Sequence, residues 1–136
     1  MKVLVTGSRD YTSKETILKA ILEIEEPIDV IIHGAAKGAD SIAQEVADYL
    51  NIPTTPVPAQ WNKFGKIAGV IRNAVMLSML DPTKDIVLAF HEDINISKGT
   101  KDMVLKAVRK KVKTILYTNF KDSPSYPYYP AQLDLT

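Results

Sequence analysis

Short apolar runs alternate with amphipathic stretches along most of this chain, and this alternation constrains the fold more than any other feature. Apolar runs at 3–6, 30–32, 86–90 and 114–117 predict buried strands, and a shorter strand is predicted at 54–57 among prolines. The runs are continuous rather than alternating, as in strands that are buried on both faces. The pattern therefore predicts an α/β fold with three layers, in which helices cover both faces of a mostly parallel sheet of about five strands.

The segments between these strands carry apolar residues at helical spacing. Thr12 and Glu15 form a T-x-x-E capping box, which predicts the start of the first helix. Further helices are predicted over 42–50, over 67–80 and over 103–108. Strand and helix thus alternate throughout, which favours right-handed crossovers between parallel strands.

Length and composition fit one domain inside a cell. A chain of 136 residues is enough for a single core. Its net charge of +1 argues against the broad basic surface of a non-specific DNA-binding protein. The absence of cysteine excludes disulfides and thiolate metal ligands. No apolar run approaches the ~20 residues of a membrane-spanning helix, so we expect a cytoplasmic protein without membrane partners.

The end of the chain differs in composition from the rest. Residues 1–118 are predicted to form the domain, and residues 119–136 a C-terminal arm rich in proline and tyrosine. Proline disfavours a regular helix or a central strand in this arm. Two interpretations are open: the tyrosines pack the arm on its own domain, or the arm reaches a partner subunit.

The least ordinary loops all follow predicted strands. GSRD follows the first strand, HGAAKGAD the second, PAQWNKFGKIAGVIRN the third and HEDINISKGT the fourth. In a parallel sheet these junctions lie at the carboxyl edge, where open α/β sheets bind ligands at the point of reversal of strand order. The loops at the opposite edge carry no comparable pattern, so we expect a ligand site at the carboxyl edge.

The loop HGAAKGAD consists mostly of small residues just before a predicted helix. Gly34 and Gly38 permit backbone conformations that other residues resist, and Ala35 and Ala39 add little bulk. Because the start of the helix has free N–H groups and the positive end of the helix dipole, phosphate is the expected ligand. Asp40 is then either the helix N-cap or an acceptor for a ligand hydroxyl. The alternative is that the loop is only a tight turn.

The stretch SKGT is a second loop of small and polar residues just before a predicted helix, the last one. Ser97 and Thr100 offer hydroxyl groups, Lys98 adds a positive charge, and Gly99 removes bulk. This signal is less specific than that of HGAAKGAD. It gains weight because both loops are expected at the same edge of the sheet.

Three larger side chains could contact the same ligand. Arg9, in the GSR stretch after the first strand, carries a guanidinium suited to bidentate phosphate contact. Arg72 lies on or near the third predicted helix and could neutralise further charge. Trp61 could stack on a base and donate one hydrogen bond.

Each of these side chains also has an ordinary structural interpretation. Arg9 could cap a neighbouring helix, and Arg72 could pair with Asp40 or Asp10 and only hold loops together. Trp61 could be a core residue at the base of a loop. The two histidines, at 33 and 91, have no nearby acidic cluster, so we predict no metal site and no certain cofactor.

Taken together, these segments resemble the YspA/YpsA-related branch of the SLOG superfamily, which is often described as a domain of unknown function. The resemblance runs from about residue 2 to about residue 117. It rests on G-A-D, A-x-W-x-x-x-G-x-x-A-G-x-x-R-N and S-x-G-T in this order. It implies a Rossmann-like fold that binds nucleotides or nucleotide-derived ligands, and a homo-oligomer. The superfamily also contains the Lonely Guy phosphoribohydrolases, which cleave a base from a nucleoside monophosphate, and DNA-processing protein A, which binds single-stranded DNA.

The resemblance places the ligand-facing positions in the four loops of the carboxyl edge. By position they are Gly7, Ser8, Arg9, Gly34, Gly38, Ala39, Asp40, Arg72, Asn73, Ser97, Gly99 and Thr100. The residues themselves add Ala35, Trp61 and Lys98 to this set.

This chain departs from the family pattern at several positions. The family usually has H-G-G-A-R-G-A-D, where this chain has Ala35 and Lys37; lysine keeps the charge but loses the fork of donors. The phosphoribohydrolases carry P-G-G-x-G-T-x-x-E, in which the glutamate takes part in catalysis. Met103 occupies that position here, and Asp102, one residue earlier, would point elsewhere on the helix. The motif therefore does not support hydrolase chemistry of that type.

Three functional hypotheses follow. The first is a sensor or ligand-binding module for a nucleoside phosphate or an ADP-ribose- or NAD-like molecule. The second is a hydrolase of an N-glycosidic bond in a nucleotide or NAD, with a catalytic carboxylate from Asp40, Glu92, Asp93 or Asp102. The third is single-stranded nucleic acid binding, against which the near-zero net charge and the few aromatic residues outside the arm count.

Overall fold

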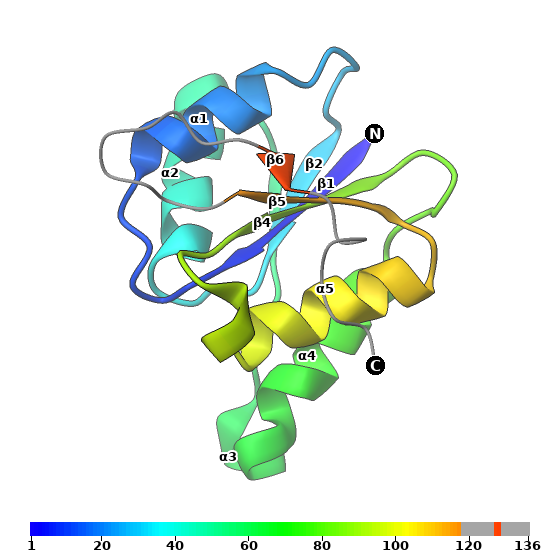
Figure 1. Cartoon of the computed structure of the whole chain (residues 1–136). Helices are drawn as coiled ribbons and strands as arrows, with labels where there is room; N and C mark the ends of the chain where they lie inside the picture. The colour runs from blue at the N-terminus through cyan, green and yellow to red at the C-terminus, as the bar shows by residue number, and fades with distance from the viewer. Residues whose placement is uncertain (118–126, 129–136) are drawn as a thin grey trace.

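Parallel strands form the centre of the fold in the computed structural model, which describes residues 1–117 and 127–128. The strands are β1 (Lys2–Gly7), β2 (Val30–His33), β3 (Thr54–Pro56), β4 (Ile86–Phe90), β5 (Lys113–Tyr117) and β6 (Pro127–Tyr128). Their order in the sheet is β3-β2-β1-β4-β5-β6, with β1 to β5 parallel and β6 antiparallel to β5 (Figure 1). The predicted mostly parallel sheet of about five strands is confirmed.

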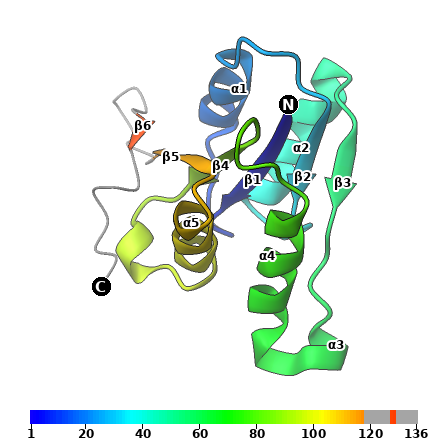
Figure 2. The same ribbon diagram turned by 90° about the vertical axis from the view of Figure 1, so that its right-hand side faces the viewer.

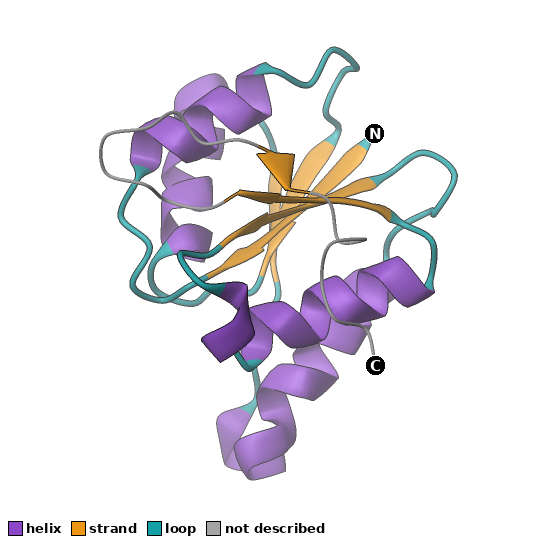
Figure 3. Ribbon diagram, viewed as in Figure 1, coloured by secondary structure: helices purple, strands orange, loops and turns teal. Residues whose placement is uncertain are grey.

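Helices cover both faces of this sheet, as predicted (Figure 2). The α-helices are α1 (Lys14–Leu22), α2 (Ala39–Leu50), α3 (Trp61–Phe64), α4 (Ala68–Ser78) and α5 (Gly99–Arg109), and the 3-10 turns are η1 (Gly65–Ile67) and η2 (Ile94–Ile96). Helices α1 and α2 pack on one face of the sheet, and helices α4 and α5 pack on the other (Figure 3). The fold is therefore a three-layer, Rossmann-like α/β fold.

Burial on both faces explains why the strands read as continuous apolar runs. Successive residues of a strand point to opposite faces of the sheet. Val3 and Val5 accordingly join the core under α1 and α2, whereas Leu4 joins the core with Met76 of α4 and Met103 of α5. All three β1 side chains are fully buried, so neither face can take polar residues at these positions.

Two predicted helix boundaries were wrong. The N-cap of α1 is Ser13, whose Oγ accepts from the N–H of Thr16 at 3.3 Å, so the predicted box at Thr12 is one residue early. The third helix does not begin at residue 67 but is preceded by α3 and η1. The break falls at Gly65, whose φ of +61° is incompatible with a continuous helix.

The C-terminal arm lies almost entirely outside the described residues. Within 119–136 the structure describes only β6, which extends the sheet beyond β5 through the pairs Leu116–Tyr128 and Tyr117–Pro127. A proline at the sheet edge agrees with its lack of an N–H donor. Whether the arm packs on its own domain or on a partner stays a prediction.

The strand order reverses between β1 and β4. These strands are adjacent, with Val3 opposite Ile86 and Gly7 opposite Phe90, so their carboxyl ends lie side by side. Open α/β sheets bind ligands at such a reversal. None of the helices in the described part of the chain has the length and apolar character needed to span a bilayer.

Candidate functional site

A cleft of about 540 Å³ opens at the carboxyl ends of β1 and β4. Its walls come from the loop after β1, the start of α2, the α3–α4 segment and the start of α5. The predicted site residues that line it are Gly7, Ser8, Arg9, Asp40, Trp61, Arg72, Asn73, Ser97, Lys98, Gly99 and Thr100. The structure thus brings together residues that lie up to 93 positions apart, between 7 and 100 in the sequence.

Four predicted site residues lie elsewhere. Gly34 and Ala35 line a second cavity, of about 380 Å³, which adjoins the cleft. Gly38 is the N-cap of α2, and Ala39 is fully buried behind it. Gly38 and Ala39 line neither of these two cavities. Their part is to allow the loop before α2 to pack closely on the rest of the chain.

Close approach within the chain explains the small residues of HGAAKGAD. Gly38 has a φ of +77°, and a Cβ there would overlap the carbonyl of Ser8. A Cβ on Gly34 would overlap the guanidinium of Arg72 and come within 3.0 Å of the Asp40 carboxylate. Neighbouring protein groups therefore require the missing bulk at both glycines.

Most backbone donors of this loop are already used inside the protein. The N–H of Ala35 donates to His33 Nδ1 at 3.0 Å, and that of Ala36 donates to Asp40 Oδ2 at 3.3 Å. The N–H of Ala39 donates to a carbonyl of the β1–α1 loop at 3.1 Å. Asp40 is thus not the helix N-cap, and the amides expected to hold phosphate are largely occupied.

The start of α5 keeps two donors available. Ser97 Oγ caps the helix by accepting from the N–H of Thr100 at 3.0 Å and from that of Lys101 at 3.3 Å. Among the described residues, the amides of Lys98 and Gly99 have no acceptor. These two amides lie at the positive end of the helix dipole, and both residues line the cleft.

Arg72 connects α4 to the loop after β2. Its Nη1 donates to the carbonyl of Gly34 at 2.7 Å, and its Nε donates to Asn73 Oδ1 at 3.0 Å. Within the described residues it forms no ion pair with Asp40 or Asp10, which was one interpretation of the sequence. Burial lowers the pKa of Arg72, the Asp40 carboxylate raises it, and nearby Arg9 lowers it again. The two arginines thus repel each other in the free protein.

Asn73 joins α4 to α5. Its Nδ2 donates to the carbonyl of Gly99 at 3.1 Å and to Asp102 Oδ2 at 3.1 Å. Asp102 also accepts from Lys106 Nζ at 3.0 Å. Asp102, a candidate catalytic carboxylate, therefore bridges two helices and does not line the cleft.

The other candidate carboxylates differ sharply in placement. Asp40 lines the cleft and is buried, and burial raises its pKa against the opposing effects of the Ala36 N–H, His33 and Arg72. Glu92 and Asp93 are exposed in the loop after β4 and do not line the cleft. Asp93 Oδ1 accepts from the N–H of Asn95 at 3.1 Å. Asp40 alone among these four carboxylates lines the cleft.

Sequence reasoning missed the part played by both histidines. His33 Nδ1 accepts the N–H of Ala35, and His91 Nδ1 accepts that of Asp93 at 2.9 Å, so each ring holds the loop that follows its strand. His91 also lines the cleft. The shared position of the two histidines, each at the end of an apolar strand, was a signal for this role. Lys66, which also lines the cleft, was missed because it lies in an irregular stretch.

Positive charge in the cleft exceeds negative charge. Among the described residues, four cations line the cleft, Arg9, Lys66, Arg72 and Lys98, against two carboxylates, Asp10 and Asp40. The guanidinium of Arg9 lies 5.8 Å from the ring centroid of Trp61, which is 47% exposed. The cleft therefore combines unmatched cations with an accessible aromatic face.

Comparisons with known proteins agree with this architecture. The family profile described as "YspA, cpYpsA-related SLOG family" matches residues 1–64. The Gene 61 protein of Mycobacterium phage D29 is 33% identical over 131 residues, which cover 90% of this chain and 98% of the relative. The name of that relative states no activity.

A solved structure is similar in fold. The X-ray structure of DNA processing protein A (DprA) from Streptococcus pneumoniae matches with a TM-score of 0.52 and 19% sequence identity. The match covers 83% of this chain and 57% of that chain, so this chain spans little more than half of DprA. At this identity the likeness concerns the fold.

Proposed function

The chain belongs to the YspA, cpYpsA-related SLOG family, and on that premise we propose that its cleft binds a nucleotide or a nucleotide-derived ligand. The protein acts as a sensor or binding module for this ligand. The expected class comprises nucleoside phosphates and ADP-ribose- or NAD-like molecules.

The excess of positive charge in the cleft carries this proposal. In the described part of the chain, four cationic side chains and two carboxylates line the cleft. Burial lowers the pKa of Arg72, Asp40 raises it, and Arg9 lowers it again, so the charge of Arg9 opposes that of Arg72. A phosphate between them would remove that repulsion and add charge-assisted hydrogen bonds.

The remaining contacts suit the other parts of a nucleotide. The amides of Lys98 and Gly99 are donors for a phosphate oxygen at the start of α5. The exposed face of Trp61 offers a stacking surface for a base. Asp40, which also lines the cleft, can accept a hydrogen bond from a ribose hydroxyl.

Asp40 also supports a second candidate, hydrolysis of an N-glycosidic bond. A buried carboxyl group with a raised pKa is suited to acid–base chemistry beside an anomeric carbon. Glu92, Asp93 and Asp102 lie off the cleft, so this reaction would depend on Asp40, with Asp10 as the other carboxylate nearby. A binding module requires fewer groups and remains the first proposal.

A thermal-shift screen tests the proposal against AMP, GMP, ADP-ribose and NAD, with chromatography of each mixture to detect released base or nicotinamide. A ligand that binds only the native state raises the melting temperature. Arg9→Ala removes a cleft cation that forms no hydrogen bond or ion pair within the described residues. We expect it to weaken binding about tenfold to a hundredfold, the range for one charge-assisted hydrogen bond.

Arg109→Ala is the matched control, because Arg109 is an exposed arginine at the far end of α5. It should bind ligand like the wild type. Equal affinity in both variants would contradict placement of phosphate at Arg9. Release of base or nicotinamide that Asp40→Asn abolishes would establish the hydrolase instead. The expected homo-oligomer is a separate prediction that light scattering tests.

A further inference from the structure

Helices α1 and α2 both end at the amino edge of the sheet, opposite the cleft (Figure 2). A shallow groove of about 270 Å³ lies at these two helix ends. Its lining is aliphatic apart from Glu26, and Leu22, Ile24, Leu50 and Ile52 belong to it. The groove is smaller than the ~300–1,000 Å³ of small-molecule sites, so it fits a few side chains of a partner rather than a whole small ligand.

The groove continues the hydrophobic core to the surface. Ile24, Leu50 and Ile52 are partly buried and pack against the core under α1 and α2. Leu22, the last residue of α1, lies beside them and is 61% exposed. Contiguous apolar surface of this kind is typical of sites that bind another protein.

Negative charge surrounds this apolar surface. Glu23, Glu25 and Glu26 follow α1, are exposed, and form no ion pair within the described residues. Lys19, in the last turn of α1, and Lys113, which shares a neighbouring cavity with the glutamates, are not paired with them. The negative dipole ends of two helices add to this charge, and the last turn of α2 contains no basic residue.

Two other segments of this chain match the groove poorly. The C-terminal arm, 119–136, carries one lysine and two aspartates, so it would bring negative charge to a negative rim. The exposed cations Arg109, Lys110 and Lys111 of a second copy would bring the right charge, but their apolar neighbour Val112 is buried. A segment of another protein with both basic and aliphatic side chains complements the groove better.

We propose that this groove is a docking site for a basic amphipathic helix of a partner protein. Aliphatic side chains on one face of that helix enter the groove beside Leu22 and Leu50. Its lysines or arginines face the three glutamates at the rim. This inference goes beyond the proposed function, because the groove and the cleft lie at opposite edges of the sheet and docking does not depend on what the cleft binds.

Fluorescence anisotropy with three labelled model peptides tests the inference. The first is an amphipathic helical peptide of leucine and lysine, the second replaces every lysine by glutamate, and the third replaces every leucine by glutamine. In about 0.15 M salt, where long-range attraction is screened, the leucine–lysine peptide should bind at least about tenfold tighter than either of the others. In NMR spectra it should shift the amide signals of residues 21–28 and 50–52.

Two variants with matched controls place the docking site. Leu22→Gln removes the exposed aliphatic side chain and should weaken the leucine–lysine peptide about tenfold, as expected for one large buried side chain. Val75→Gln, at a 43% exposed valine of α4 on the other face of the sheet, should bind like the wild type. Glu26→Lys should weaken binding severalfold, whereas Glu15→Lys, the same change of charge in the first turn of α1, should not.

Several outcomes would overturn the inference. No binding of the leucine–lysine peptide would do so, as would equal losses in each variant and its control, or amide shifts confined to other surfaces. Self-association of the protein alone that Leu22→Gln abolishes, measured by sedimentation, would assign the groove to a second copy instead. Nucleotide binding is measured separately by the thermal-shift screen, so either proposal can fail while the other stands.

Discussion

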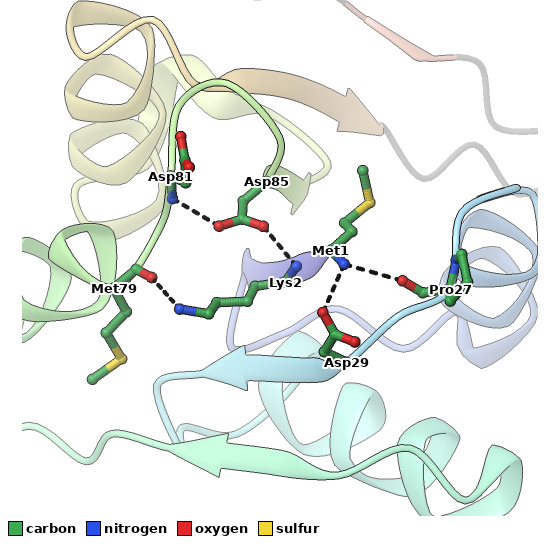
Figure 4. A network of polar contacts seen from close by, with 7 residues as sticks. All are labelled: Met1, Lys2, Pro27, Asp29, Met79, Asp81 and Asp85. Carbon is green, nitrogen blue, oxygen red and sulfur yellow. Dashed lines mark hydrogen bonds and ion pairs between the residues drawn. The ribbon is translucent and has the colours of Figure 1, made fainter.

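The charged groups at the two edges of the sheet differ in how far they are paired within the chain. At the amino edge, charges find partners within the chain (Figure 4). The ammonium group of Met1 donates to Asp29 Oδ2 at 2.8 Å and to the carbonyl of Pro27 at 3.1 Å, and Lys2 Nζ donates to the carbonyl of Met79 at 2.9 Å. At the carboxyl edge, the four cations that line the cleft outnumber the two carboxylates that the described residues place there.

Asp85 is the centre of the amino-edge network. It is buried and accepts from the N–H groups of Lys2 and Asp81, both at 2.7 Å (Figure 4). Its counterpart at the carboxyl edge is Asp40, which is also buried but has a pKa raised by that burial. The comparison indicates that the charged groups of the amino edge contribute to folding, whereas those of the carboxyl edge are left unpaired for the ligand that we propose.

Loss of Asp85 should have the largest effect on stability. Asp85→Ala leaves two part-buried N–H groups without an acceptor, which should lower the free energy of unfolding by about 2–4 kcal/mol. Urea denaturation measures this change. Asp85→Asn keeps one acceptor oxygen and should cost less. If Asp85→Ala is nearly neutral, the amino edge has no special part in folding.

Asn73 is the carboxyl-edge group for which the next largest effect is expected. Asn73→Ala removes the hydrogen bonds from α4 to Gly99 and Asp102 and the acceptor of Arg72. We expect a loss of about 1–3 kcal/mol, together with weaker ligand binding because Arg72 loses its orientation. Asn95→Ala, at an exposed asparagine, is the control and should change neither quantity.

The pH dependence of two aspartates should have opposite signs at the two edges. The pKa of Asp40 is raised, so the folded protein binds its proton more tightly, and stability falls as pH rises from 3.8 through the folded pKa. Asp40→Asn should therefore raise the melting temperature of the free protein at pH 7. This gain should vanish below the unfolded pKa of about 3.8.

Asp29 should behave in the reverse way. The hydrogen bond and the charge of the N-terminal ammonium lower its pKa, so its contribution is present above 3.8 and is lost as pH falls through the folded value. Asp29→Asn should lower the melting temperature at pH 7, by a small amount because the side chain is exposed. Melting temperatures of both variants between pH 3 and 7 test this difference. A change of the same sign in both variants at pH 7 would contradict it.

The smallest effect is expected from two residues with positive φ. Ala35, at the carboxyl edge, has a φ of +55°, and Lys111, at the amino edge, has a φ of +60°. Replacement of either by glycine relieves the left-handed strain, partly offset by the entropy of glycine, and should stabilise the fold by up to about 1 kcal/mol. Only Ala35→Gly should also alter ligand affinity, because only Ala35 lines a cavity.

The layered fold could be predicted because burial on both sheet faces leaves a simple pattern. Continuous apolar runs located the core strands, and Ile86–Phe90 was predicted at its observed bounds. The start of α1 was misplaced by one residue, because hydroxyl side chains that can cap a helix stand next to each other at 12 and 13, and Ser13 is the cap in the structure. The turn at Gly65 escaped prediction because apolar periodicity does not report a positive φ.

The position of the cleft could be predicted, but the contacts within its walls could not. Strand order and loop composition indicated the carboxyl edge, and the lining of the cleft lies there. The sequence could not show that the Ala36 and Ala39 amides are used by Asp40 and by the loop after β1, since those partners meet only in the folded chain. Nor could it show that Asp102 contacts Asn73 across two helices.

Trp61 gives the cleft a built-in optical reporter. It is the single tryptophan of the chain, it is 47% exposed, and it lies beside the guanidinium of Arg9. Indole emission from this protein therefore comes from one place, the wall shared by the two cavities. A ligand that stacks on the indole ring or displaces Arg9 should change the intensity or the wavelength of this emission. Stopped-flow fluorescence of the unmodified protein should then give arrival and departure rates without any attached dye.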